Sequence, residues 1–321
     1  MTMLEFELSE RFFSAWGGGE GVPLGYGADA ALLDLGPGLA MCLDTLVEGV
    51  HFPVDTPADA VGHKALAVNL SDLAAMGAEP GWALLGLTLP DNSAAWVAGF
   101  AQGMRALAER TGVALIGGDT TRGPRTITVQ LTGCVAPDLA LRRSGARVGD
   151  EIYVSGYLGD AALGLRLWQA GERAGPAVGR LLRPEPRLAL GRALRGLATA
   201  GVDVSDGLAA DLSHILSASG VGGVLDVERL PLSPALLGRV GRVEAEALAL
   251  TGGDDYELCF TAPPEAAEVL RKVSEQLALP ITRIGRIEGG GALRVLRQGR
   301  PIRLDRLGYQ HVAGAGGSDE A

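Results

Sequence analysis

The stretch Asp203-Val204-Ser205-Asp206-Gly207 places two carboxylates and a hydroxyl group where a short apolar run of the chain stops. A strand that ends at Val204 would direct Asp203 and Asp206 into a crevice. A helix that begins near Gly207 would point its unpaired backbone N–H groups at an anion. The stretch therefore predicts an α/β fold with a metal and phosphate site at a strand-to-helix corner.

Four other acidic segments also resemble loop or helix-edge positions for carboxylates. They are residues 27–30, 43–45, 69–72 and 117–123. Oxygen ligands in this number suit Mg²⁺ that holds phosphates. Taken alone, an aspartate in a glycine-rich turn is more often a turn former or helix cap, and Asp72 on a helix is more often part of a solvated face.

One common site explains these aspartates more simply than a separate role for each. The six aspartates concerned are Asp29, Asp44, Asp72, Asp119, Asp203 and Asp206. Like charges about 4 Å apart repel by about 4 kcal/mol at an effective dielectric constant of 20. Several divalent ions would therefore have to share the site, and a multi-metal phosphoryl-transfer site is the economical interpretation.

Length and composition predict two domains in a chain of 321 residues. Strands and helices alternate along it, and its 47% apolar content and 48 glycines fit a compact α/β enzyme. The composition changes around residues 137–150. We therefore expect an N-terminal domain over residues 1–140, a C-terminal α/β domain over 141–312, and a disordered Gly-rich acidic tail over 313–321.

The formal charge of −10 argues against nucleic-acid and anionic-membrane partners, which require a positive surface. An acidic protein that binds a nucleotide must bring cations with it. The three cysteines have no CxxC spacing, which argues against a zinc knuckle or a disulfide framework. The start has no signal-peptide pattern, and no apolar run approaches the roughly 18 residues of a membrane span. We expect a soluble cytoplasmic protein.

Phosphate-binding candidates lie in two further places. The segment Gly117-Gly118-Asp119-Thr120-Thr121-Arg122-Gly123 could surround a phosphate with backbone N–H groups, or could be a polar hairpin loop. Arg143 is a candidate for bidentate phosphate binding, or a surface arginine. The chain has no GxxxxGK[ST] motif and no protein-kinase motifs. His51, taken by itself, is more often a structural histidine.

With these segments in place, the chain resembles the thiamine-monophosphate kinase family, which belongs to a larger group of ATP-using enzymes related to aminoimidazole ribonucleotide synthetase. The resemblance covers most of the chain. Six motifs in the same order carry it, at residues 44–52, 64–77, 117–123, 149–156, 203–207 and 252–260.

The resemblance implies transfer of the γ-phosphoryl group of ATP to thiamine monophosphate, with several Mg²⁺ ions. It also implies a homodimer whose N-terminal mixed sheets join into a barrel, and a C-terminal α/β domain that closes over the nucleotide. By position, the six aspartates resemble the Mg²⁺ ligands, with Leu43 limited to its backbone carbonyl. Gly118, Asp119, Arg143 and Ser205 resemble nucleotide contacts, and His51, Asp254 and Tyr309 fall where the family contacts thiamine. Asp203, Asp206 and Arg143 are the residues we expect to act in catalysis.

The chain departs from the family pattern at three positions. Ala28 replaces the first of two acids, Cys42 and Leu43 replace Ser/Thr oxygens, and Asp254 stands where Glu is common. These departures bear on metal number and substrate affinity.

Three alternatives stay open. A selenophosphate synthetase would show a reactive Cys in an early loop, and a hydrogenase-maturation relative would end in a Cys-bearing tail; the chain shows neither. A non-catalytic dimer that binds Mg-nucleotide is the alternative from a different functional class.

Overall fold

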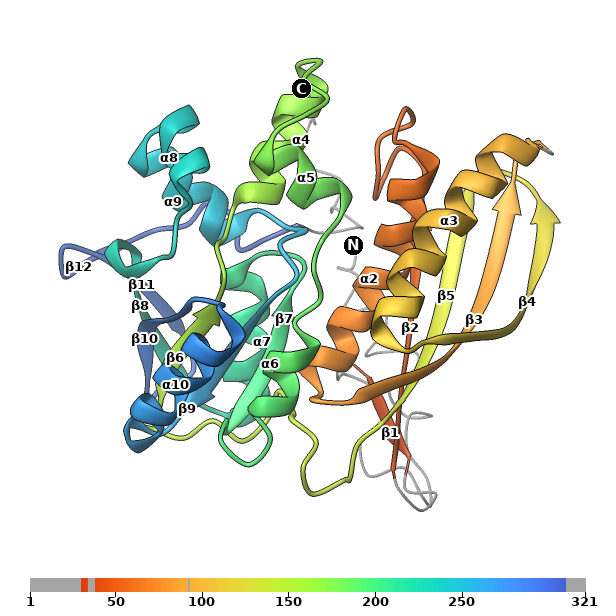
Figure 1. Ribbon diagram of the computed structural model, residues 1–321. Coiled ribbons are helices and arrows are strands. Elements are labelled where there is room, and N and C mark those ends of the chain that lie inside the picture. Colours follow the sequence, from red (N-terminus) through yellow and green to blue (C-terminus); the bar gives the residue numbers. More distant parts are fainter. Residues whose placement is uncertain (1–29, 34–37, 92, 310–321) are drawn as a thin grey trace, which may run out of the picture.

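The computed structural model describes residues 30–33, 38–91 and 93–309, which form two parts that lie side by side (Figure 1). Asp29 and the tail predicted over 313–321 lie outside the described residues. No helix in the described part is both long and apolar enough to cross a membrane.

The N-terminal part is a mixed sheet with two helices on one face. Its strands are β1 (Ala31–Leu33), β2 (Leu39–Val47), β3 (Glu79–Leu89), β4 (Ala114–Arg122) and β5 (Thr126–Cys134), in the spatial order β1-β2-β5-β3-β4. Only β3 and β4 pair in parallel. Alternate residues of β5, including Ile127, Val129 and Leu131, are buried. They share one core with residues of α2 (Ala58–Ala75) and α3 (Ala94–Thr111).

The C-terminal part is a second mixed sheet with helices around it. Its strands are β6 (Glu151–Ser155), β7 (Ala200–Val204), β8 (Gly222–Asp226), β9 (Glu257–Ala262), β10 (Ile281–Glu288), β11 (Leu293–Arg297) and β12 (Arg300–Ile302), in the order β12-β11-β8-β10-β6-β9-β7. Its helices are α4 (Asp160–Gln169), α5 (Pro176–Leu182), α6 (Leu188–Ala193), α7 (Leu208–Ser219), α8 (Pro234–Val240), α9 (Arg242–Thr251) and α10 (Ala267–Leu277), with 3₁₀ turns η2 (Val227–Arg229) and η3 (Pro264–Ala266). The two-domain α/β fold predicted from the sequence is confirmed at this level.

Helix α2 joins the two parts. It is rich in alanine and almost entirely buried, as expected for a helix that is apolar on every side. Figure 1 shows it between the N-terminal sheet and the C-terminal part. Strand β7 is at the edge of its sheet, yet all five of its residues are buried, because α2 packs beside it. This contact covers an edge that would otherwise be open to pairing.

Glycines allow α2 and α3 to cross at very short range. A Cβ added at Gly103 would lie 1.8 Å from the backbone oxygen of Asp59, and one at Gly62 would lie 2.0 Å from the oxygen of Phe100. Side chains at either position would force the helices apart.

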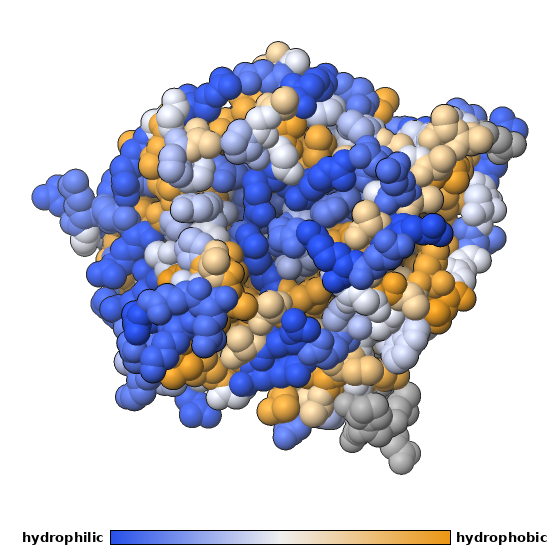
Figure 2. Space-filling view, viewed as in Figure 1, coloured by the Kyte–Doolittle hydropathy of each residue, from blue (hydrophilic) through white to orange (hydrophobic). Residues whose placement is uncertain are grey.

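Polar contacts also cross between the two parts. The Ser71 hydroxyl of α2 donates to Asp203 Oδ2 at 2.6 Å. The Lys64 ammonium of α2, only 3% exposed, donates to Asp254 Oδ2 at 2.9 Å and to the backbone oxygen of His51 at 3.1 Å. Hydrophilic residues gather over the middle of the face shown in Figure 2. Arginines of the C-terminal part also pair with acids of the N-terminal part, as in Arg192–Glu79.

The other face of the N-terminal sheet has no helix over it in the described part of the chain. Large apolar side chains stand exposed on β2, β3 and β4, namely Leu43, Trp82, Leu84 and Ile116. Every residue of β4 is exposed, and among the described strands β4 pairs only with β3.

We expect Gly103→Ala to lower the free energy of unfolding by about 1–3 kcal/mol, because the added methyl group overpacks the helix crossing. Urea unfolding measures the change. Gly179→Ala in α5 is the matched control, since a Cβ there meets nothing within 4 Å. It should stabilise by about 0.4–1 kcal/mol through a lower entropy of the unfolded chain. Equal effects of the two substitutions would contradict the close crossing.

We expect Lys64→Met to lower the free energy of unfolding by about 1.5–3 kcal/mol, the usual range for hydrogen bonds to charged groups. Partial exposure of Asp254, at 31%, limits the loss because water can solvate the carboxylate. Lys272, the other lysine of the chain, is 61% exposed and 3.8 Å from Glu268. Lys272→Met should change stability by less than about 0.5 kcal/mol in the same urea series. If Lys64→Met lowers the free energy of unfolding by no more than Lys272→Met does, the buried ammonium does not hold the two parts together.

Candidate active site

The corner predicted from Asp203–Gly207 forms as a strand-to-helix turn. Strand β7 ends at Val204, and α7 begins at Leu208 with Gly207 at its N-cap. Gly207 has φ of +129°, which favours glycine. The Asp203 side chain is 4% exposed and accepts the Ser71 hydroxyl, so α2 and β7 meet at this carboxylate.

A carboxyl group of the chain itself occupies this helix start. Asp211 Oδ2 accepts the backbone N–H groups of Ser205, Asp206 and Gly207 at 3.1, 3.1 and 3.0 Å. Burial, followed by the charges of Asp206 and Asp203, raises the pKa of Asp211 well above its usual value. The prediction that these N–H groups receive a bound anion is corrected: a side chain four residues along the helix already occupies them.

Carboxylates from three elements act on one buried thiol. Burial raises the pKa of Cys42 well above its ordinary value, and the negative charges of Asp72, Asp44 and Asp203 raise it further. Charge effects weaken with distance, so these aspartates of β2, α2 and β7 lie around the same point. The structure therefore brings together three of the six predicted aspartates.

A second buried group, the phenol of Tyr256, is affected by an overlapping set of carboxylate charges. The pKa of the Tyr256 phenol is raised well above its ordinary value by burial and then by Asp254, Asp44 and Asp203. The phenol donates to Asp254 Oδ1 at 3.1 Å. Asp254 therefore lies beside the cluster, and Tyr256 stays neutral there.

The loop that carries Asp254 is held in an unusual conformation. Asp254 and Tyr256 have φ of +70° and +49°, a region that costs most residues about 1–3 kcal/mol. The Asp254 and Tyr256 N–H groups donate to the backbone oxygens of Ser205 and Val204, both at 2.8 Å. The loop is thus fastened to the corner that contains Asp203 and Asp206.

Two predicted substrate contacts surround Lys64. Its ammonium group binds both the backbone oxygen of His51 and the Asp254 carboxylate, which brings residues 203 positions apart in the chain close together. His51 Nδ1 accepts the N–H of Val47 at 3.0 Å, so a neutral His51 carries its proton on Nε2.

The remaining predicted contacts of the C-terminal part lie at the corner. Tyr309 is 47% exposed, and its N–H donates to the backbone oxygen of Asp206 at 2.9 Å. The positive charge of Arg143 partly offsets the rise in the pKa of Asp211, which burial causes first, so its guanidinium is near the same turn. Ser205 is part of the turn itself. These positions are where the sequence places nucleotide and thiamine contacts.

Asp119 and Gly118 lie apart from this cluster within one chain. Residues 117–122 are not a loop around a phosphate but the end of β4, paired in parallel with β3. Asp119 is opposite Gly86 of β3, whereas Asp44 is opposite Val129 of β5. Three strand spacings, about 14 Å along the sheet, separate β4 from β2. The Leu43 side chain is exposed, and its neighbours Cys42 and Asp44 point to the opposite face of β2.

The donor set of the cluster fits ions that share their coordination with a nucleotide. The described residues contain no group of three or more His, Cys, Asp or Glu side chains arranged to hold one ion. Mg²⁺ usually takes only one or two carboxylates together with substrate phosphates. Carboxylates on separate elements, crowded around Cys42 and Tyr256, meet that requirement.

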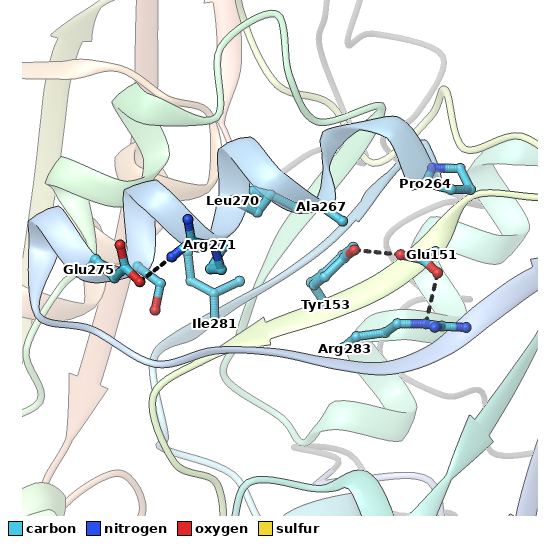
Figure 3. Close-up of a pocket in the computed structure, with 10 residues that line it drawn as sticks. Glu151, Tyr153, Pro264, Ala267, Leu270, Arg271, Glu275, Ile281 and Arg283 are labelled. Atoms are coloured by element: carbon cyan, nitrogen blue, oxygen red, sulfur yellow. Dashed lines mark hydrogen bonds and ion pairs between the residues drawn. The ribbon is translucent and has the colours of Figure 1, made fainter.

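An open groove elsewhere gives no sign of substrate binding. It has a volume of about 490 Å³ and lies between α10 and strands β6 and β10 (Figure 3). Its charged groups already pair with one another or with neighbours: Glu151 with Tyr153 and Arg283, and Arg271 with Glu275. None of the predicted site residues lines it.

Four residues that shape the site were not singled out from the sequence. They are Lys64, Ser71, Asp211 and Tyr256. Lys64 had a usable signal, because it is one of only two lysines and lies in an apolar helix. Ser71 had none, because its partner Asp203 lies on a segment that only the tertiary fold brings near. Asp211 and Tyr256 bind groups that are close to them in sequence, but residue type alone does not reveal those hydrogen bonds.

Family models match both parts of the chain. The AIR synthase related protein N-terminal domain matches residues 27–135, and the corresponding C-terminal domain matches residues 147–297. Between them they cover most of the chain.

Curated relatives and solved structures agree with this family. The thiamine-monophosphate kinase of Escherichia coli K12 is 46% identical over 98% of this chain and 99% of its own length. The crystal structure of thiamine-monophosphate kinase from Stenotrophomonas maltophilia K279a is 50% identical, with a TM-score of 0.79 over 92% of this chain and 97% of that one. AaThiL complexed with AMPPCP and TMP is 33% identical, with a TM-score of 0.84 over 96% and 97%. The chain therefore belongs to the thiamine-monophosphate kinase family of AIR synthase related proteins.

Proposed function

We propose that this protein transfers the γ-phosphoryl group of ATP to the phosphate of thiamine monophosphate, giving thiamine diphosphate and ADP. The observation that carries the proposal is the convergence of Asp44, Asp72 and Asp203, from both parts of the chain, around Cys42. Two phosphorylated anions can approach such a cluster only with divalent cations between them. The E. coli relative has this activity in its name, and the AaThiL structure was solved with AMPPCP and TMP.

The substrate positions follow from the same geometry. We place thiamine monophosphate against His51 and Asp254, which Lys64 holds together, and near Tyr309, which is fastened to Asp206. We place the nucleotide phosphates at Asp203, Ser205 and Asp206, with Arg143 close to that turn. The two substrates then meet at the corner between β7 and α7.

The reaction needs no general base. The acceptor is a phosphate monoester with a second pKa near 6, so it is largely dianionic at pH 7. One of its oxygens bonds to the γ-phosphorus in line with the departing β–γ bridging oxygen, and ADP leaves. Bound Mg²⁺ ions, held by Asp44, Asp72, Asp203 and Asp206, would neutralise the phosphates. The chain's own residues position the two anions, and Arg143 adds positive charge.

Asp203→Asn and Asp72→Asn should each lower kcat/KM by at least about a hundredfold, because each removes charge that holds the metal-bound phosphates. Their unfolding temperatures should stay level or rise, since repulsion within the cluster is relieved. A coupled assay of ADP release, with and without thiamine monophosphate, measures turnover.

Asp138→Asn, at an exposed position, is the control and should match the unsubstituted protein. Full activity in either cluster variant would remove that residue from the site. Binding of Mg-ATP without turnover that depends on thiamine monophosphate would instead favour the non-catalytic nucleotide-binding dimer.

We propose that the uncovered face of the N-terminal sheet binds a second copy of the chain. The face carries Leu43, Trp82, Leu84 and Ile116, and β4 offers an unpaired edge among the described strands. Joining two such sheets would give the barrel expected from the family. It would also allow Gly118 and Asp119 of one copy to approach the Asp44 cluster of the other, which they do not reach within their own chain.

Ile116→Glu should convert the dimer to monomer, because it would bury an unpaired charge in the interface. Sedimentation velocity measures the mass, and activity should fall with the dimer. Val243→Glu on α9 is the matched control, since Val243 and Ile116 are exposed to 65% and 63%. A monomeric unsubstituted protein, or a dimer that survives Ile116→Glu, would overturn this interface.

The cytoplasmic location expected from the sequence stays a prediction.

A further inference from the structure

Asp211 is a buried carboxylate that none of the predicted roles uses. It lies in the first turn of α7 and is 3% exposed. A single oxygen, Oδ2, accepts three successive backbone N–H groups, those of Ser205, Asp206 and Gly207. Three donors on one oxygen fix the direction of three consecutive peptide groups.

The remaining backbone contacts of this turn point the other way. The oxygens of Val204 and Ser205 accept N–H groups from the loop of Asp254 and Tyr256, and the oxygen of Asp206 accepts the N–H of Tyr309. The amides of the turn are thus gathered inward on Asp211, while its carbonyls are held from outside. The inward half of this arrangement depends on a single side chain.

This turn carries three groups that we expect to bind Mg-nucleotide. Asp203, Ser205 and Asp206 lie within a stretch of four residues, and Asp211 determines the path of the backbone from which their side chains extend. A change in the peptide planes at residues 205–207 would move Asp206 relative to Asp203. Residues that orient metal ligands in this way typically contribute 10- to 100-fold to metal affinity or activity.

We propose that Asp211 is a positioning residue for phosphoryl transfer: as an internal hydrogen-bond acceptor for the Ser205–Gly207 amides, it sets the geometry with which Asp203 and Asp206 bind the divalent cation and nucleotide. This inference rests on the proposed function for its reaction, but its central test does not. Asp211 touches neither substrate in this arrangement and acts through the turn.

The test compares Asp211→Asn with the unsubstituted protein by Mn²⁺ titration, following free Mn²⁺ by electron paramagnetic resonance without nucleotide. The amide keeps one acceptor oxygen, but an NH2 group, which donates, replaces the other oxygen of the carboxyl group. We expect the Kd for Mn²⁺ to rise by about 10- to 100-fold. In activity assays, the KM for Mg-ATP should rise more than the KM for thiamine monophosphate, because His51 and Lys64 lie on other elements and only Asp254 and Tyr309 are hydrogen-bonded to the turn.

Asp160→Asn is the matched control. Asp160 is also a buried aspartate in the first turn of a helix, α4, but its carboxylate accepts the Ser233 hydroxyl and is affected by Arg180 and Glu257 rather than by the corner. We expect both variants to lose stability in urea, and only Asp211→Asn to lose Mn²⁺ affinity. Equal Mn²⁺ affinity in folded Asp211→Asn and Asp160→Asn would overturn the proposal and leave Asp211 as a helix cap alone.

Gly207→Ala is a second test of the proposal, for use if Asp211→Asn does not fold. A Cβ at Gly207 would lie 3.0 Å from the backbone carbon of Thr251, in a conformation that favours glycine, so it shifts the same amides while the carboxylate stays. Weaker Mn²⁺ binding supports the proposal, and unchanged binding overturns it. If the protein binds Mn²⁺ and ATP but does not phosphorylate thiamine monophosphate, the proposed function is wrong. The Mn²⁺ affinities of the variants would still decide the role of Asp211.

Discussion

Repulsion between carboxylates at the junction of the two parts is the constraint that the rest of the structure has to satisfy. Asp44, Asp72 and Asp203 crowd around Cys42, and Asp254 joins them around Tyr256. Carboxylates removed from water need hydrogen bonds or counter-charges. The chain supplies some of both, through the Ser71 hydroxyl and the Lys64 ammonium. These two groups leave the cluster with a net negative charge, and that charge favours the binding of divalent cations.

Helix α2 combines the structural and the chemical roles. Its small side chains allow close packing on α3, on the N-terminal sheet and on β7 at the same time. The same helix carries Asp72 into the cluster and, through Lys64 and Ser71, fixes carboxylates of the C-terminal part. Any displacement of α2 would therefore alter stability and site geometry together. The polar residues Lys64 and Ser71 of α2 are buried because they bind carboxylates of a site that is itself buried.

Two devices hold the corner after β7. The loop at residues 252–256 accepts positive φ at Asp254 and Tyr256 in order to donate N–H groups to the corner from outside. Asp211 gathers the amides of the corner from inside. Backbone strain at such a place persists only when the surroundings over-determine it. Here the strained loop also places the Tyr256 ring in the N-terminal core, which anchors one part of the protein in the other.

The sequence by itself determined the local elements and the chemical character of the site. The apolar run that stops at Val204 and the glycine at position 207 located the end of β7 and the start of α7, because helix and strand limits depend on neighbouring residues. Motif order was sufficient for the family, and acidic segments near strand ends indicated a metal and phosphate site. Only the tertiary structure decided which groups meet. Lys64 with Asp254 and Ser71 with Asp203 are 190 and 132 positions apart, and Asp119 stands away from Asp44 because β5 and β3 lie between their strands. Spacing along a chain carries no information on such contacts, since they arise from the packing of elements whose order in space differs from their order in sequence.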